Sequence, residues 1–328
     1  MHRYVSVAFL GLSFLIAGLV PLLSWGQSFP SKPITVIAPY GPGVALDTAC
    51  RYIVSKLAER TGWTIIVDNR PGADGVIGVQ AVLNLPADGH AVLAAISTLA
   101  ILPTSKKGQL PYDPIKDLVP LTRFINFQSL LFANPSFAAN TFAEALAWSK
   151  ANPGKLDFAT SGRGSWNHLL GELLKLETGI DMTNIAYKAG PQMTVDLMAG
   201  VIPLVVVSAP EMVPHVRAGK VKALVAIGTR RAAAFPNVPA ISETIPSFAS
   251  LDTDPWAGFM VKAGTPAPLI ARLHGEIVTT LRAPETRTRI AELGGAPVDE
   301  SPESYRAKYQ SDIARWDKVV TEAKLKFD

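Results

Sequence analysis

The stretch from Ile34 to Leu57 restricts the possible folds more than any other part of the chain. It joins a short apolar run rich in β-branched residues, Ile34–Ala38, to a Gly41-Pro42-Gly43 turn and an amphipathic segment. The run predicts a strand buried on both faces, which the glycines and the proline terminate. Apolar residues at helical spacing predict a helix after the turn, and they are Ala45, Ala49, Ile53 and Leu57. Free backbone N–H groups and the helix dipole favour an anion above such a strand end.

A second unit of the same kind lies in the other half of the chain. Phe158–Thr160 predicts a short strand, 161–165 (SGRGS) a glycine-rich turn, and Trp166–Thr178 a helix. Strands and helices alternate around both units with short connections, which is typical of parallel sheets flanked by helices. We therefore expect an α/β fold with two lobes, each a mostly parallel sheet, and the two turns facing each other across a cleft. Ser97 and Thr98 follow the predicted strand Ala91–Ala95 and should lie on the same side as the first turn.

The first residues have the pattern of a signal peptide. His2 and Arg3 precede an apolar segment, Val5–Leu23, and 24–26 (SWG) places small residues at the two positions that a signal peptidase reads. We expect residues 1–26 to be cleaved and the mature chain to be exported to the periplasm. An uncleaved membrane anchor is the alternative, because the apolar segment is long enough to span a bilayer.

Composition and spacing argue against several other classes. The 31 Lys and Arg and 27 Asp and Glu residues are scattered without a basic block, so we expect no nucleic-acid partner. Cys50 is the only cysteine, which excludes an internal disulfide and predicts a small buried residue. His168 and Glu172 have a metal-ligand spacing but lack a third ligand nearby, so we expect no metal and no cofactor. Ser165 and His168 lack the third member of a catalytic triad, so we expect no catalytic residue.

The last part of the chain contains too few predicted strands to form a domain by itself. It is rich in helical patterns, such as Pro268–Arg282 and Pro302–Lys324. We expect it to return to the first lobe, so that lobe 1 comprises 27–125 and 250–328 and lobe 2 comprises 126–249. Two crossings between the lobes predict a hinge around the cleft, as in binding proteins that close on a ligand.

A series of short phrases runs along the mature chain, each weak alone but specific together: 30–34 (PSKPI), 39–43 (PYGPG), 68–73 (DNRPGA), 110–114 (LPYDP), 151–156 (ANPGKL), 218–224 (AGKVKAL) and 263–266 (AGTP). In this order they resemble the solute-binding receptors of tripartite tricarboxylate transport systems, the TctC or Bug family. The resemblance implies a periplasmic-binding-protein-like, Venus-flytrap fold and a receptor that is not an enzyme. It further implies that the receptor captures a small carboxylate and delivers it to the membrane subunits of a tripartite tricarboxylate transporter. We expect a monomer.

The resemblance also implies which residues bind the ligand. In that family backbone amides, hydroxyls and ordered water hold the carboxylate without a salt bridge. The contacts implied in lobe 1 are Tyr40, Gly41, Pro42, Gly43, Val44, Ala45, Ser97 and Thr98. Those implied in lobe 2 are Ser161, Gly162, Gly164 and Ser165, with Tyr187 nearby.

Four positions depart from the family pattern and bear on the ligand. Val44 replaces a usual glycine and should narrow the floor of the site. Val207 stands where the family often has an acidic residue that suits an amino group, which favours an apolar or aromatic acid over an amino acid. Arg163 either pairs with a second ligand carboxylate, as in a dicarboxylate, or is solvated at the rim. Trp166 either stacks on an aromatic ligand or packs on its own lobe.

The alternative function is an exported hydrolase or isomerase that acts on a small carboxylate in the same cleft. Such an enzyme needs an activated nucleophile or an acid with a perturbed pKa, and the chain shows no convincing set. A receptor remains the favoured interpretation.

Overall fold

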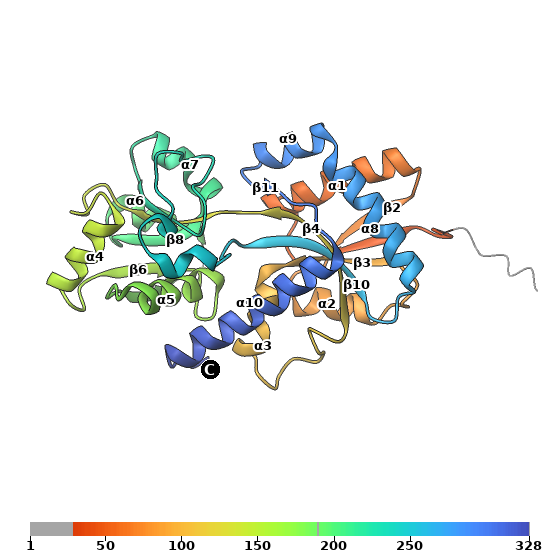
Figure 1. Ribbon diagram of the computed structural model, residues 1–328, viewed down its shortest axis with the longest axis horizontal. Coiled ribbons are helices and arrows are strands. Elements are labelled where there is room, and N and C mark those ends of the chain that lie inside the picture. The colour runs from red at the N-terminus through yellow and green to blue at the C-terminus, as the bar shows by residue number, and fades with distance from the viewer. Residues whose placement is uncertain (1–28, 189, 328) are drawn as a thin grey trace, which may run out of the picture.

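The computed structural model describes residues 29–188 and 190–327, which form two α/β lobes side by side (Figure 1). The predicted signal peptide lies outside the described residues. Each lobe has one mixed sheet with helices on its faces. The two-lobed α/β class is therefore confirmed.

The sheet of the first lobe has six strands in the order β11-β4-β10-β3-β1-β2. Their bounds are β1 (Ile34–Ala38), β2 (Ile65–Asn69), β3 (Ala91–Ile96), β4 (Leu118–Asn126), β10 (Trp256–Lys262) and β11 (Ala296–Pro297). The helices of this lobe are α1 (Ala45–Thr61), α2 (Val76–Leu83), α3 (Leu102–Ser105), α8 (Ala267–Arg282), α9 (Pro284–Glu292) and α10 (Pro302–Glu322), with short 3₁₀ turns η1 (Ala73–Gly75) and η2 (Ser97–Ala100).

The sheet of the second lobe has five strands in the order β7-β6-β8-β5-β9. Their bounds are β5 (Ser129–Ala133), β6 (Asp157–Thr160), β7 (Thr183–Ala186), β8 (Leu204–Ser208) and β9 (Lys222–Ile227). The helices are α4 (Phe142–Ala151), α5 (Trp166–Thr178), α6 (Gly190–Ala199) and α7 (Ala209–Arg217), followed by the 3₁₀ turns η3 (Ile241–Glu243) and η4 (Pro246–Ser250).

The sheets differ from the expectation in strand direction, because they are mixed rather than mostly parallel. In the first lobe β1 runs parallel to β2 and β3, whereas β10 runs antiparallel to β3 and β4. The reason is the way the chain crosses between lobes. β4 leaves the first lobe and continues into β5, and β10 brings the chain back beside β4 in the opposite direction (Figure 1). The two crossings are bonded to each other, since the Phe127 N–H donates to the Pro255 carbonyl over 2.8 Å.

The C-terminal helix α10 adds a non-covalent connection between the lobes. It packs on β4 and α3 of the first lobe and on α5 of the second (Figure 1). The Trp256 Nε1–H donates to Asp312 Oδ2 of α10 over 2.8 Å, which ties the helix to the returning strand. Trp316 of α10 meets the Trp166 ring of α5 edge to face, with 4.8 Å between ring centroids. Among the described residues no helix is long and apolar enough to cross a membrane.

Candidate ligand-binding site

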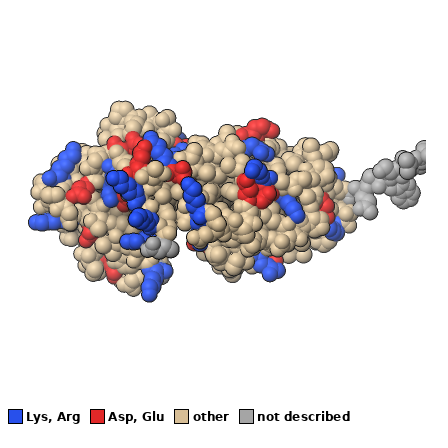
Figure 2. Space-filling model, turned by 90° about the horizontal axis from the view of Figure 1, so that it is seen from below, with Lys and Arg blue, Asp and Glu red and all other residues tan. Residues whose placement is uncertain are grey.

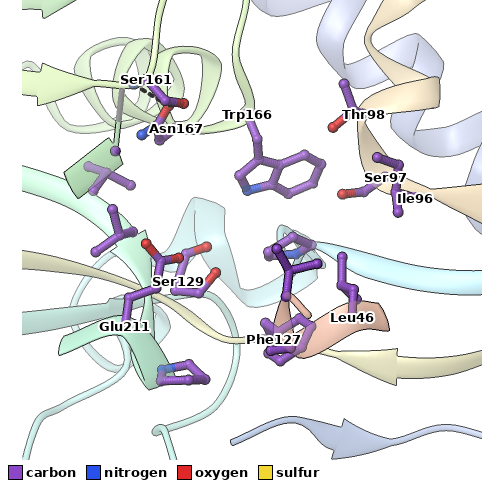
Figure 3. A pocket seen from close by; sticks show the side chains of 18 of the residues that line it. Leu46, Ile96, Ser97, Thr98, Phe127, Ser129, Ser161, Trp166, Asn167 and Glu211 are labelled. Atoms are coloured by element: carbon purple, nitrogen blue, oxygen red, sulfur yellow. Dashed lines mark hydrogen bonds between the residues drawn. The ribbon is translucent and has the colours of Figure 1, made fainter. Parts of the chain in front are cut away.

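A cavity of about 600 Å³ lies between the lobes, where the crossing segments meet the first turns of several helices. Figure 2 shows the surface hollowed between the lobes, with Lys and Arg interspersed among Asp and Glu on that face. The cavity is lined by Val44, Ala45, Leu46, Ile96, Ser97, Thr98, Phe127, Ser129, Ser161, Trp166, Asn167, Gly190, Met193, Val206, Val207, Ser208, Pro210, Glu211, Pro255 and Trp256 (Figure 3). Its size and its apolar walls with few polar groups are typical of a small-molecule site.

The two glycine turns predicted from the sequence have the same local geometry. Gly43 and Gly164 have φ of 83° and 75°, a left-handed conformation that glycine adopts without strain. Each is followed by an extended N-cap residue, Val44 (φ −69°, ψ 160°) before α1 and Ser165 (φ −69°, ψ 161°) before α5. The chain therefore presents two equivalent helix N-termini to the cavity, one from each lobe.

The backbone N–H of each glycine donates a hydrogen bond to the side chain of the residue four positions later in the chain. The Gly43 N–H donates to Asp47 Oδ2 over 2.9 Å, and the Gly164 N–H donates to His168 Nδ1 over 3.0 Å. These N–H groups are consequently not free for a ligand. The glycines shape the turns, and residues of the following helical turns line the cavity.

The first-turn N–H groups that remain belong to residues lining the cavity. They are those of Ala45 and Leu46 in α1 and of Trp166 and Asn167 in α5. Within the ranges the structure describes, no residue accepts a hydrogen bond from any of them. Such N–H groups at the positive end of a helix dipole bind carboxylates without a cationic side chain.

Asp47 and His168, the buried side chains that accept from the two glycine N–H groups, both have pKa values below their ordinary ranges. Burial raises the pKa of Asp47, but hydrogen bonds from Asn69, the Gly43 N–H and Arg51 outweigh it and keep the pKa below its ordinary value. Burial, with Lys175 and Arg163 nearby, lowers the pKa of His168 to about 4. His168 is thus neutral at neutral pH, as its role as acceptor at Nδ1 requires.

Asn167 is a site residue that the sequence analysis missed. Its Oδ1 accepts from the Ser161 N–H over 3.2 Å and from the hydroxyls of Ser161 and Ser165 over 3.1 and 2.6 Å. Its Nδ2 donates to no residue in the described part of the chain. Figure 3 shows Asn167 and Ser161 on one wall of the cavity and Ser97 and Thr98 on the other, so hydroxyl and amide groups border it from both lobes.

The predicted site residues fall into three groups. Val44, Ala45, Ser97, Thr98, Ser161, Trp166 and Val207 line the cavity. Arg163, Gly164 and Ser165 line a neighbouring cleft of about 410 Å³, which shares Thr98, Ser161 and Trp166 with the cavity. The structure places the others outside the lining of the cavity: Tyr40, Gly41, Pro42, Gly43, Gly162 and Tyr187. The Tyr40 side chain is buried beside Cys50, and the Tyr187 hydroxyl donates to Asp196 over 2.9 Å.

The structure bears on the alternatives left open for Arg163 and Trp166. Arg163 shares the neighbouring cleft with Lys106 and Asp74, which pair over 3.2 Å, and does not line the main cavity. Trp166 lines both spaces and packs on Trp316 of the C-terminal helix, not only on its own lobe. Together with Thr98 and Ser161 it therefore borders both the cavity and the neighbouring cleft.

Glu211 is the second residue that the sequence analysis missed. It lies in the first turn of α7 and lines the cavity four residues after Val207. A signal for it exists in the sequence, because Ser208-x-x-Glu211 after an apolar strand is typical of a helix start. The sequence analysis considered position 207 alone and did not weigh Glu211.

The site offers little for catalysis. The Ser165 hydroxyl lies 2.6 Å from both the Gly162 carbonyl oxygen and Asn167 Oδ1, which share its one proton, and His168 Nδ1 accepts from the Gly164 N–H, so Ser165 and His168 hold the turn. In the described ranges no three His, Cys, Asp or Glu residues are grouped so as to hold a metal ion. The arrangement is suited to binding an anion reversibly.

Comparisons with known proteins agree with this geometry. Residues 49–325 match the family model described as tripartite tricarboxylate transporter family receptor. The chain is 32% identical to the protein BugT of Bordetella pertussis over 98% of each chain. A solved periplasmic transporter superposes with a TM-score of 0.76 and 31% identity, covering 92% of this chain and 100% of the other. The R. palustris protein Rpa4515 with adipate gives a TM-score of 0.76 and 26% identity over 91% and 99%. The chain belongs to the TctC/Bug family of periplasmic solute-binding receptors.

Proposed function

We propose that this protein captures a small carboxylate in the periplasm and delivers it to the membrane subunits of a tripartite tricarboxylate transporter. The observation that carries the proposal is the meeting of two equivalent helix N-termini at one cavity. Their N–H groups at Ala45, Leu46, Trp166 and Asn167 come from both lobes, and none of the described residues that line the cavity is a Lys or Arg. Peptide dipoles rather than a salt bridge would hold the anion.

Binding at both lobes suggests how the ligand controls the receptor. A carboxylate that contacts α1 and α5 together stabilises a closed arrangement, because an open one loses one of the two sets of contacts. The crossings Asn126–Ser129 and Thr253–Pro255 are the hinge in this proposal. They fit the division into 27–125 with 250–328 and 126–249.

The family and the predicted leader support export and handover as parts of this proposal. Residues 1–26 serve as a cleaved signal peptide in this proposal, which places the mature chain in the periplasm. The adipate complex of Rpa4515 supports a small carboxylate as the ligand class here.

A thermal-shift and calorimetry screen tests the proposal. Mono- and dicarboxylates of four to eight carbons would be added to the purified mature chain, with amides of the same length as uncharged controls. Stabilisation by acids but not by amides, without product in mass spectrometry, supports a receptor. Product formation from any bound acid would support the hydrolase or isomerase instead, and no binding by any acid would overturn the carboxylate receptor.

A further inference from the structure

Trp166 lies where the ligand cavity meets the neighbouring cleft. Among the described residues, the cavity of about 600 Å³ and the cleft of about 410 Å³ share Thr98, Ser161 and Trp166 in their linings. Two of the three have short hydroxyl side chains, whereas tryptophan has the largest side chain of any residue. Figure 3 shows the Trp166 ring between Asn167 on one side of the cavity and Ser97 on the other. A passage from the cavity into the cleft therefore runs past this ring.

The C-terminal helix supports the Trp166 ring from the other lobe. The rings of Trp166 and Trp316 meet edge to face with 4.8 Å between their centroids. Trp316 is fully buried in α10, and Asp312, one turn before it, accepts from the Trp256 Nε1–H over 2.8 Å. Because α5 belongs to the second lobe and α10 to the first, the two lobes together hold the ring in place.

The polar atom of the Trp166 side chain has no part in holding it. Its Nε1 is buried and has no hydrogen-bond partner in the ranges 29–188 and 190–327. An unpaired buried N–H is unfavourable, and the Trp256 Nε1–H, by contrast, is paired with Asp312. A substitution of Trp166 thus removes ring volume without breaking a side-chain hydrogen bond among the described residues.

The spaces on the two sides of the ring differ in charge. None of the described residues that line the cavity is a Lys or Arg. The cleft contains Lys106, which pairs with Asp74 over 3.2 Å, and Arg163, which forms no ion pair within the described part of the chain. Arg163 and Trp166 are three positions apart, so their Cα atoms are separated by at most about 11 Å. A long dicarboxylate bound at the α5 N-terminus would therefore have to pass the ring to bring its second carboxylate to Arg163.

We propose that Trp166 determines the specificity of this receptor by closing the cavity toward the cleft, so that the ligand is a compact monocarboxylate with an apolar body. The proposal rests on the proposed function and deepens it by naming the ligand class. The carboxylate of such an acid binds the N-termini of α1 and α5, and its apolar body stays on the cavity side of the ring. A long dicarboxylate is rejected, because the ring keeps its second carboxylate from the guanidinium group that would bind it.

Calorimetry on matched ligands tests the proposal. The probes are benzoate and 3-methylbutanoate as compact monocarboxylates, and unbranched α,ω-dicarboxylates of four to twelve carbons. We expect the wild-type protein to bind one compact acid at least tenfold more tightly than any dicarboxylate. Trp166→Ala should raise the affinity for a dicarboxylate of eight or more carbons at least tenfold relative to that for the compact acid. Adding Arg163→Gln to Trp166→Ala should remove this gain, because the guanidinium is then absent.

A graded series and a matched control accompany these variants. Trp166→Phe keeps an aromatic ring at the boundary and should raise the relative affinity for long dicarboxylates less than threefold. Trp148→Ala removes a tryptophan of α4 in the same lobe, which packs on Phe137 with 5.3 Å between ring centroids and lines neither space, and it should leave the order of affinities unchanged. Thermal melts establish that the variants are folded, and Trp166→Leu, which keeps an apolar side chain against Trp316, replaces an unfolded alanine variant.

The outcomes separate this inference from the proposed function. If the wild-type protein binds a long dicarboxylate most tightly and Arg163→Gln alone weakens it tenfold, the ligand reaches the cleft past the ring. This result overturns the inference and leaves the carboxylate receptor standing. If Trp166→Ala changes the affinities of all acids by the same factor, the ring merely supports α5 and the inference is again overturned. Failure of every acid to bind overturns the receptor itself.

Discussion

The backbone N–H of Gly164 donates to Nδ1 of His168 over 3.0 Å, and His168 follows it by four residues. The pair matches Gly43 and Asp47 in the other lobe, so a neutral imidazole and an ionised carboxylate perform the same task. Both acceptors fix a glycine turn from the first turn of the helix that it starts. The first turns of α1 and α5, whose residues line the cavity, are thereby held in place before a ligand arrives.

His168→Ala should loosen the second turn. The Gly164 N–H loses its acceptor, which costs about 1–2 kcal/mol of the free energy of unfolding, and carboxylate affinity should fall severalfold because α5 is less well oriented. Urea denaturation and calorimetry measure the two effects. His215→Ala, in the last turn of α7, serves as a control that should change neither. Unchanged stability in His168→Ala would show that the turn does not depend on this hydrogen bond.

Asp47→Ala should be more damaging than the loss of its cationic partner. Buried Asp47 accepts from Gly43, Arg51 and Asn69, so its removal leaves several donors unpaired and should cost about 3 kcal/mol. Arg51 is partly exposed, and Arg51→Ala should cost less than about 1 kcal/mol. Urea denaturation of both variants checks the ratio. Equal losses would mean that the ion pair, not the network around the glycine turn, stabilises α1.

The order of strands and helices was predictable because the spacing of apolar residues within each segment indicates its secondary structure. Ile34–Ala38 and Trp166–Thr178 were predicted with the bounds observed. Strand β4 was missed, because it follows a proline-rich segment and contains Pro120 and Arg123. Helix α7 was missed for a similar reason, since Pro210 and Pro214 interrupt its pattern. The antiparallel direction of β10 beside β3 and β4 depends on pairing between segments far apart in the sequence. It could therefore not be predicted from the sequence of any one of these strands.

The site was predictable to the extent that strand ends determine it. Ser97, Thr98, Ser161 and Trp166 follow strands, and the sheets bring them to one cavity. Predicting Glu211 as a site residue required knowing where α7 begins. Predicting Asn167 required knowing the hydrogen bonds that Ser161 and Ser165 make to its amide oxygen. That the Gly43 and Gly164 N–H groups donate to Asp47 and His168, and not to a ligand, could likewise be seen only from the positions of these side chains.

Asp254 should make stability fall as pH rises. Burial and the neighbouring Asp252 raise its pKa to about 7, although Arg230 and Lys308 lower it. Between its ordinary pKa of 3.8 and 7 the native state binds more protons than the unfolded state, so the free energy of unfolding decreases with pH over that window. Asp254→Asn removes this contribution and should gain stability relative to wild type from pH 4.5 to 8. Urea denaturation across that range measures the difference, with exposed Asp317→Asn as the control. A constant difference would show that Asp254 does not titrate in this window.

Val44→Ser should strengthen the start of α1. Val44 caps the helix without a side-chain hydrogen bond, whereas Ser165, in the same backbone conformation, accepts from the His168 N–H over 3.4 Å. Because the Val44 side chain is 47% exposed, replacing it removes little buried apolar surface. A serine hydroxyl at this position can accept from the Asp47 N–H and should add about 1 kcal/mol to the free energy of unfolding relative to Val44→Ala. Urea denaturation compares the two variants, and equal stabilities would mean that the α1 N-terminus does not reproduce the capping seen at α5.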